Sequence, residues 1–224
     1  MSFVPGAPVF VQGMPNNNVE AEDVVSYEFG ARSQPSEAFF WDVAVFLNDY
    51  SDLVAFNPSG PPTAPPPPFV GLAVPLQFEN DPAHRMTWGG ELATTVKPTD
   101  DWDFRLAYSY VRGERALTDL NGSPRNLLYF NSGHDLGCDW ELNVIGRYQD
   151  LLPSDPGGVI PSAPVSPYFE MDAQLTWQPL RDLEFNLVGR NLLQRSHFEA
   201  PADPSSGIVN PTLREFYGGV TYRY

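Results

Sequence analysis

The sequence has little of several features that mark common protein classes. A single cysteine, Cys138, stands among 224 residues, which excludes an intrachain disulfide. No apolar run reaches the ~18 residues that a transmembrane helix requires. Residues 1–20 lack the basic start and apolar stretch of a signal peptide. Basic residues number 13 against 28 acidic ones, giving a net charge of -15, which argues against nucleic acid as a partner.

Motifs of common catalytic, cofactor and metal sites are also missing. The histidines His84, His134 and His197 are far apart in the sequence and lack the spacing of metal ligands. The stretch "SHFE" places His197 and Glu199 two positions apart, where we expect a solvated loop in preference to a metal site. No nucleophile elbow, phosphate-binding loop or dinucleotide fingerprint occurs. We therefore predict no catalytic residue, no cofactor and no metal, and hence no enzyme.

What the sequence does contain is alternation. In "YFEMDAQLTW" and "DWDFRLAYSYV", large apolar side chains recur at every second position and polar ones fill the gaps. That period is the signature of a strand with one apolar and one polar face. We count nine such segments, at 23–33, 38–50, 87–96, 101–111, 126–136, 140–148, 168–177, 182–191 and 214–224.

The connections between these segments alternate in length. Four are short, at 34–37, 97–100, 137–139 and 178–181, and four are longer, at roughly 51–83, 114–124, 149–167 and 194–213. The longer ones are rich in Pro, Gly, Ser, Asn and Asp. Strict alternation predicts an all-β, antiparallel up-and-down meander with tight turns on one side and large loops on the other. Transmembrane β-barrels of bacterial outer membranes have this asymmetry.

The aromatic residues provide a second test of a membrane location. Four tryptophans occur in the apolar register beside the short turns, and the terminal tyrosine lies on the same side: Trp41, Trp102, Trp140, Trp177 and Tyr224. Tyrosines mark the opposite strand ends at Tyr50, Tyr110, Tyr148 and Tyr168. Two aromatic bands around an apolar belt favour a membrane barrel. We expect the four tryptophans and Tyr224 to lie at one membrane interface. The alternative is a soluble β-sandwich that binds a ligand through its loops.

The opposite face of the same strands is charged. We assign to it carboxylates such as Glu170, Asp172 and Glu184 and arginines such as Arg147 and Arg190. A small closed barrel fills its interior with side chains, and few charges can be buried there unpaired. So many charged residues predict a wide lumen that is wet or plugged, in which the charges compensate one another.

Several segments, in order, resemble one family of proteins. They are "VEAEDVVSYEFGAR" with "WDVAVFLNDYSDL", then "GGELATTVKPTDDWDFRLAYSYV", "PYFEMDAQLTWQPLRDLEFNLVGRNLLQRSHFEA" and "REFYGGVTYRY". This series resembles the C-terminal strands of TonB-dependent outer-membrane receptors over roughly residues 15–224. The resemblance implies a place in a barrel of about 22 strands that encloses an N-terminal plug.

The resemblance also implies a function. Such receptors take up scarce, large nutrients such as ferric siderophores, cobalamin or glycans, with energy from the TonB protein. We expect residues 1–22 to be a loop leading into the strands and residues 23–224 to be the C-terminal portion of the barrel. With about nine strands, no plug and no TonB box, the chain is expected to be a fragment that does not transport alone. Its expected partners are outer-membrane lipid, the barrel-assembly machinery and, only through the missing plug, the TonB system.

The last strand carries a further expectation. Phe216, Val220, Tyr222 and Tyr224 recur with period two up to the final residue. An aromatic terminal strand resembles the one that the assembly machinery of outer-membrane barrels reads. An unpaired strand edge with alternating apolar side chains is suited to recognition by strand addition. We therefore predict that these four residues form an assembly signal, and that Tyr224 also anchors the strand end at the interface.

Overall fold

The computed structural model describes residues 9–65, 67–68, 70–113, 123–153, 164–200 and 210–224. Every regular element in these ranges is a strand. No helix in them is long and apolar enough to cross a membrane. The chain divides into two compact units, one of Met1–Ser26 with Asn48–Met86 and one of Tyr27–Leu47 with Thr87–Tyr224.

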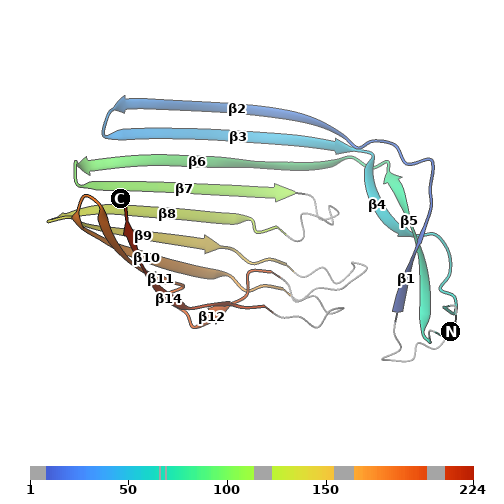
Figure 1. The fold of residues 1–224 in the computed structure, drawn as a ribbon. Helices are drawn as coiled ribbons and strands as arrows, with labels where there is room; N and C mark the ends of the chain where they lie inside the picture. Colours follow the sequence, from blue (N-terminus) through green and yellow to red (C-terminus); the bar gives the residue numbers. More distant parts are fainter. Residues whose placement is uncertain (1–8, 66, 69, 114–122, 154–163, 201–209) are drawn as a thin grey trace. The chain divides into compact units, whose positions relative to one another are not determined.

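The second unit is built on a sheet of nine strands (Figure 1). Their order is β14-β11-β10-β9-β8-β7-β6-β3-β2, so almost every strand lies beside its neighbours in sequence. The strands are β2 (Asp23–Ser36), β3 (Phe39–Ser51), β6 (Arg85–Thr99), β7 (Trp102–Gly113), β8 (Asn126–Gly137), β9 (Trp140–Gln149), β10 (Tyr168–Leu180), β11 (Leu183–Arg190) and β14 (Glu215–Tyr222). The predicted nine-stranded antiparallel meander is confirmed.

Tight turns join the strands where the short connections were predicted. Between β8 and β9 only Cys138 and Asp139 remain outside the strands, and both have positive φ, 53° and 65°. Two successive residues with positive φ form the turn whose twist matches that of the flanking strands. The turn sets the register of β8 and β9, in which Leu142 lies opposite His134.

The two faces of the sheet differ as the alternation predicts. On one face Trp140 stacks on Trp177, and Trp177 stacks on Phe185, with ring centroids 5.4 Å apart in both pairs. These rings come from β9, β10 and β11, whose residues are directly opposite one another. Many large apolar side chains of this face are exposed, among them Phe29 at 76% and Phe216 at 68%. A soluble sandwich would bury such a face against a second sheet, and this one stays open.

The sheet does not close on itself. In the described part of the chain, β2 pairs only with β3 and β14 pairs only with β11, so two edges remain. The β14–β11 register is continuous from Leu183 opposite Tyr222 to Arg190 opposite Glu215. The other edge of β14 therefore presents its backbone groups without a strand partner.

The first unit contains structure that the sequence analysis missed. Within 1–22, expected as a loop, β1 (Val9–Met14) pairs in parallel with β5 (Leu72–Asp81). Within 51–83, expected as a long connection, β4 (Leu53–Pro58) pairs with β5. Prolines suggested a loop here, but Pro75 lies inside β5 and its carbonyl accepts a hydrogen bond from Ser59. Ala73 and Leu76 of β5 are buried.

The expected long connections after β7, β9 and β11 lie partly outside the described residues. Within the third, 194–213, two short strands occur, β12 (Ser196–His197) and β13 (Thr212–Leu213). They pair with each other as a separate two-stranded ribbon. That connection is therefore partly ordered, and its ordered part helps to build the site described next.

Neighbouring positions in β10 test which face meets lipid. Leu175 lies opposite Leu142 and Leu187 on the apolar face, whereas the exposed Gln174 lies opposite Asn143 on the polar face. In a complete barrel that includes residues 23–224, we expect Leu175→Arg to lower the free energy of unfolding by about 2–4 kcal/mol. Gln174→Arg should lower it by under about 1 kcal/mol, because its side chain meets water or polar groups. Urea unfolding in lipid vesicles measures both, and equal losses would contradict the assignment.

Candidate functional site

A network of charges crosses the polar face between β9 and β10. Arg147 of β9 lies directly opposite Glu170 of β10 in the antiparallel register. Its Nη2 donates to Glu170 Oε1 at 2.9 Å and to Asp172 Oδ2 at 2.7 Å. The carboxylate side chains are 7% and 14% exposed, and the arginine side chain is 45% exposed. One guanidinium therefore compensates two largely buried carboxylates, as buried charges require.

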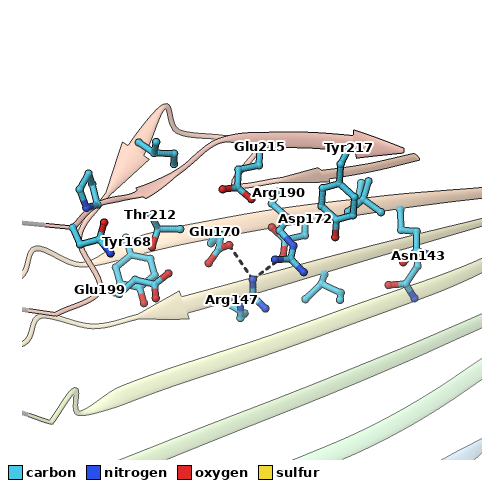
Figure 2. A pocket seen from close by; sticks show the side chains of 17 residues that line it. Asn143, Arg147, Tyr168, Glu170, Asp172, Arg190, Glu199, Thr212, Glu215 and Tyr217 are labelled. Atoms are coloured by element: carbon cyan, nitrogen blue, oxygen red, sulfur yellow. Dashed lines mark hydrogen bonds and ion pairs between the residues drawn. The ribbon is translucent and has the colours of Figure 1, made fainter. Parts of the chain in front are cut away.

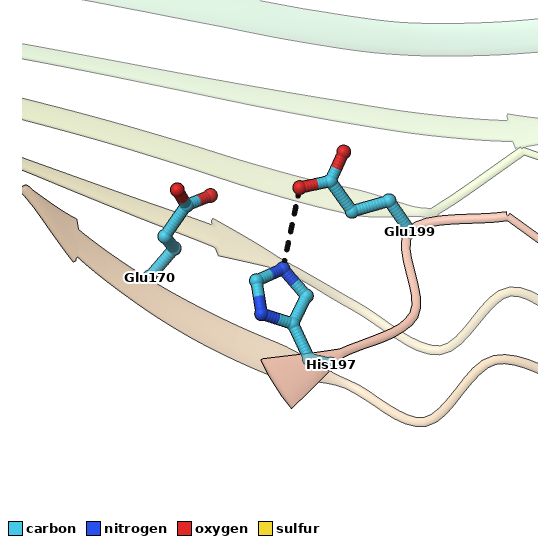
Figure 3. A group of neighbouring side chains, drawn as sticks. All are labelled: Glu170, His197 and Glu199. Atoms are coloured by element: carbon cyan, nitrogen blue, oxygen red, sulfur yellow. Dashed lines mark ion pairs between the residues drawn. The ribbon is translucent and has the colours of Figure 1, made fainter. Parts of the chain in front are cut away.

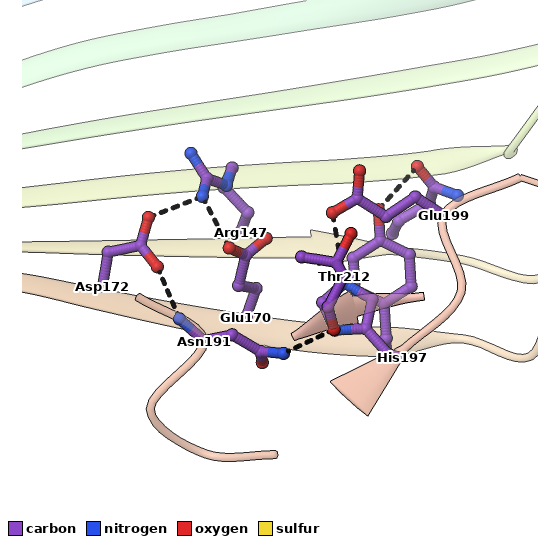
Figure 4. Close-up of polar contacts among 9 residues, drawn as sticks. Arg147, Glu170, Asp172, Asn191, His197, Glu199 and Thr212 are labelled. Carbon is purple, nitrogen blue, oxygen red and sulfur yellow. Dashed lines mark hydrogen bonds and ion pairs between the residues drawn. The ribbon is translucent and has the colours of Figure 1, made fainter. Parts of the chain in front are cut away.

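Asp172 extends this network to the chain beyond β11 (Figure 4). Its Oδ1 accepts a hydrogen bond from the backbone N–H of Asn191 at 2.9 Å. Asn191 is fully buried and has a φ of 49°, a conformation that asparagine adopts more readily than most residues. Its side-chain Nδ2 donates to the backbone carbonyl oxygen of Thr212 at 3.2 Å. Its backbone carbonyl oxygen accepts a hydrogen bond from Arg214 Nε at 3.3 Å. These bonds hold the ribbon of β12 and β13 beside the first half of β10.

The ribbon places His197 against the start of β10. The imidazole stacks on the ring of Tyr168 with centroids 4.2 Å apart, and the residue is only 8% exposed. The expectation of a solvated loop is therefore wrong for His197, because the ribbon folds its side chain inward. Its Nε2 lies 3.3 Å from Glu199 Oε1, and Glu170 points toward the same place (Figure 3). The expectation of solvent holds for Glu199, whose side chain is 47% exposed.

Of these groups, Arg147, Tyr168, Glu170, Asp172 and Glu199 line an open concavity of about 920 Å³ on the polar face (Figure 2). Four strands and the ribbon contribute to its wall. Carboxylates and arginines alternate along it, and Arg190 lies over the ring of Tyr217 at 5.5 Å from its centroid. The charged residues that line it are Arg147, Glu170, Asp172, Arg190, Glu199 and Glu215. Such a wall suits a polar or charged solute in water.

The predicted interface aromatics occupy the apolar face. Trp140 and Trp177 are brought into contact, whereas Trp41 and Trp102 lie on β3 and β7. Trp102 packs edge-on against the rings of Phe104 and His134. Their common position beside the short turns is as predicted, and their role at a membrane interface remains a prediction.

The last strand also has the predicted alternation. Phe216, Val220 and Tyr222 are 68%, 65% and 62% exposed, and Tyr224 follows the end of β14 with its side chain in the open. Their role as an assembly signal remains a prediction. Tyr168 was expected in the second aromatic band, and this expectation is wrong. Its ring lies on the polar face, where its hydroxyl donates to Gln149.

Sequence reasoning missed the residues that organise this site. Asn191 follows the dipeptide "GR" at the end of β11. That position after a strand is the only sequence feature that could have indicated a buried asparagine with positive φ. The approach of His197 to Glu170 depends on a ribbon of two-residue strands, for which alternation provides no pattern. The pairing of Arg147 with Glu170 could have been predicted from the sequence, because both residues lie on the polar face of adjacent predicted strands.

Comparisons with known proteins identify relatives of this fold. The family model described as "TonB dependent receptor-like, beta-barrel" matches residues 2–192. A sequence search of curated proteins finds no match. Among solved structures, the fold is similar to a Pseudomonas aeruginosa ferric enterobactin receptor mutant in complex with enterobactin, with a TM-score of 0.68 at 18% identity. That alignment covers 95% of this chain and 33% of the receptor.

Two further solved structures give the same result. The FrpB iron transporter from Neisseria meningitidis has a TM-score of 0.65 at 16% identity, covering 95% of this chain and 32% of that protein. The copper transporter OprC has a TM-score of 0.67 at 15% identity, covering 95% and 34%. The chain thus spans about a third of the length of the receptors that it matches.

The charge network predicts a large effect of removing its arginine. Arg147→Met leaves Glu170 and Asp172 without their cation, and we expect it to lower the free energy of unfolding by about 2–4 kcal/mol. Arg223→Met is the matched control, because Arg223 is 60% exposed and pairs with Glu184 at 3.0 Å. An exposed pair of this kind contributes about 0–1 kcal/mol. Urea unfolding of a complete barrel in vesicles measures the free energy of unfolding of both variants. An equal loss of stability in Arg223→Met and Arg147→Met would contradict the assigned role of Arg147.

Proposed function

The chain belongs to the TonB-dependent receptor-like β-barrel family, and from this premise we propose that it forms part of the wall of an outer-membrane uptake receptor. One observation carries the proposal. The nine-stranded sheet exposes large apolar side chains on one face and has a concavity lined by charged groups on the other. A sheet with these faces separates lipid from a wet lumen.

The location follows from the family. Proteins of this family are outer-membrane β-barrels, and we propose the same membrane for this chain, with outer-membrane lipid against the apolar face. The tryptophans of that face, Trp41, Trp102, Trp140 and Trp177, would lie at one membrane interface with Tyr224. Indole and phenol rings favour this level because they are apolar and also have one polar group to hydrate.

The open edges support a further part of the proposal. In hydrocarbon, an unpaired backbone N–H or carbonyl costs several kcal/mol, so neither β2 nor β14 can remain an edge in the bilayer. We propose that both edges pair with additional barrel strands, and that the nine strands do not transport by themselves. The lumen plug and its contact with TonB would likewise lie outside these strands.

The receptors of similar fold and the charged concavity suggest a class of cargo. The solved structures of similar fold include receptors named for ferric enterobactin, iron and copper. We propose a scarce nutrient that is too large or too rare for passive diffusion, with a ferric siderophore first, ahead of cobalamin or a glycan. The charged concavity beside β10 supports a polar solute in the lumen.

Lipid exposure of adjacent residues tests the proposed function directly. In a Cys138→Ser background, single cysteines at Leu187, 57% exposed on the apolar face, and at Val188, which lines the concavity, would carry a fluorophore. In a complete barrel in vesicles, we expect a lipid-borne nitroxide to quench the probe at 187 and aqueous iodide to quench the probe at 188. Quenching of both probes by iodide alone would fit a soluble sandwich and would exclude the membrane wall.

The last strand makes a separate prediction about assembly. We propose that Phe216, Val220, Tyr222 and Tyr224 are read by the barrel-assembly machinery, and that Tyr224 also anchors the strand. Residues 214–224 would be grafted as the final strand of a complete barrel, with and without Tyr224. We expect deletion to slow insertion in cells severalfold and to leave folding into pure lipid vesicles nearly unchanged. If both rates fall alike, Tyr224 is an anchor only.

A further inference from the structure

A histidine and two glutamates converge at the edge of the concavity. Glu170 comes from β10, His197 from β12, and Glu199 from the segment that follows β12. One ligand atom of each lies within 4.8 Å of the other two, and this is the one such group in the part of the chain that the structure describes. We propose that Glu170, His197 and Glu199 bind a divalent first-row transition metal ion of the Zn²⁺ class.

The buried imidazole provides the strongest argument. His197 is 8% exposed, and among the described residues neither of its ring nitrogens has a hydrogen-bond partner. The approach of Nε2 to Glu199 at 3.3 Å lacks hydrogen-bond alignment. A buried polar group without a partner costs free energy, so native structures rarely leave one. Coordination of a metal ion by one nitrogen would satisfy this ring, which Tyr168 holds in place by stacking.

The carboxylates are prepared for the same task. Glu170 accepts a hydrogen bond from Arg147 through Oε1 at 2.9 Å, which holds its carboxylate on the side of the concavity that His197 faces. Ligands at about 2.1 Å from one tetrahedral ion lie about 3.4 Å apart, so atoms within 4.8 Å of one another must approach by up to about 1.4 Å. The exposed side chain of Glu199 can make that movement, because no described hydrogen bond restrains its carboxylate.

The donor set selects the class of ion. Ca²⁺ and Mg²⁺ prefer oxygen ligands throughout, whereas one imidazole with two carboxylates suits Zn²⁺ and its first-row neighbours. Three protein ligands leave a coordination position for water or a solute. A bound ion would also tie the β12–β13 ribbon to β10, next to the bond between Asn191 and Asp172. The site is formed by β10, β12 and the segment that follows β12, and it is independent of the proposed function.

Metal titration of a complete barrel that includes this chain tests the site. The barrel, refolded in detergent micelles, would be titrated with Zn²⁺ against a chromogenic chelator and with Co²⁺ for its visible absorption. We expect one ion bound at this site. His197→Gln and Glu199→Gln should each weaken Zn²⁺ binding by at least about tenfold and change the Co²⁺ spectrum. His84→Gln is the matched control, because His84 has an exposed side chain outside the group, and it should leave both readouts unchanged.

Circular dichroism separates loss of the site from loss of the fold. If His197→Gln alters the strand signal, Glu199→Gln at its exposed position decides the question. The proposal is overturned if Zn²⁺ affinity and the Co²⁺ spectrum are the same in the wild-type chain and in both variants. It is equally overturned if His84→Gln weakens binding as much, since the ions would then be held by scattered surface groups.

Discussion

Each strand of the nine-stranded sheet has to serve two environments at once, because successive side chains of a strand point to opposite faces. This constraint determines where almost every residue of the sheet can be. Trp140, Trp177 and Phe185 stack across three strands on one face, while Arg147 and Glu170 pair across two of the same strands on the other. Apolar packing and charge compensation therefore share one backbone without competing for space.

The polar face depends on this register for its organisation. Arg147 compensates Glu170 and Asp172 only because β9 and β10 align these positions, and Asp172 is then placed to bind the backbone of Asn191. The buried turn at Asn191 orients the ribbon that brings His197 to Glu170. The position of His197 therefore depends on a series of hydrogen bonds that begins with the pairing of β9 and β10.

The alternation of side chains between two faces also explains which parts of the structure could be predicted from the sequence. Nine strands, their tight turns and their faces could be read from period two, because alternation over many residues leaves little choice of register. Strands β1, β4 and β5 were missed, since they are short or contain proline and their pairing joins segments far apart in the sequence. The surroundings of His197 were missed for a similar reason. They depend on a ribbon of two residues per strand and on Asn191, whose conformation a sequence pattern does not reveal.

Alternation across the sheet also limits how chains of this kind can change in length. Inserting or deleting one residue within β9 or β10 would send every later side chain of that strand to the opposite face. Charged groups would then meet the apolar side, and the stacked rings would meet water. A substitution alters one position, whereas a single-residue shift reverses a whole strand. Length variation among related chains is therefore expected to accumulate in the long connections, with the two-residue turn at Cys138 and Asp139 among the places least able to absorb it.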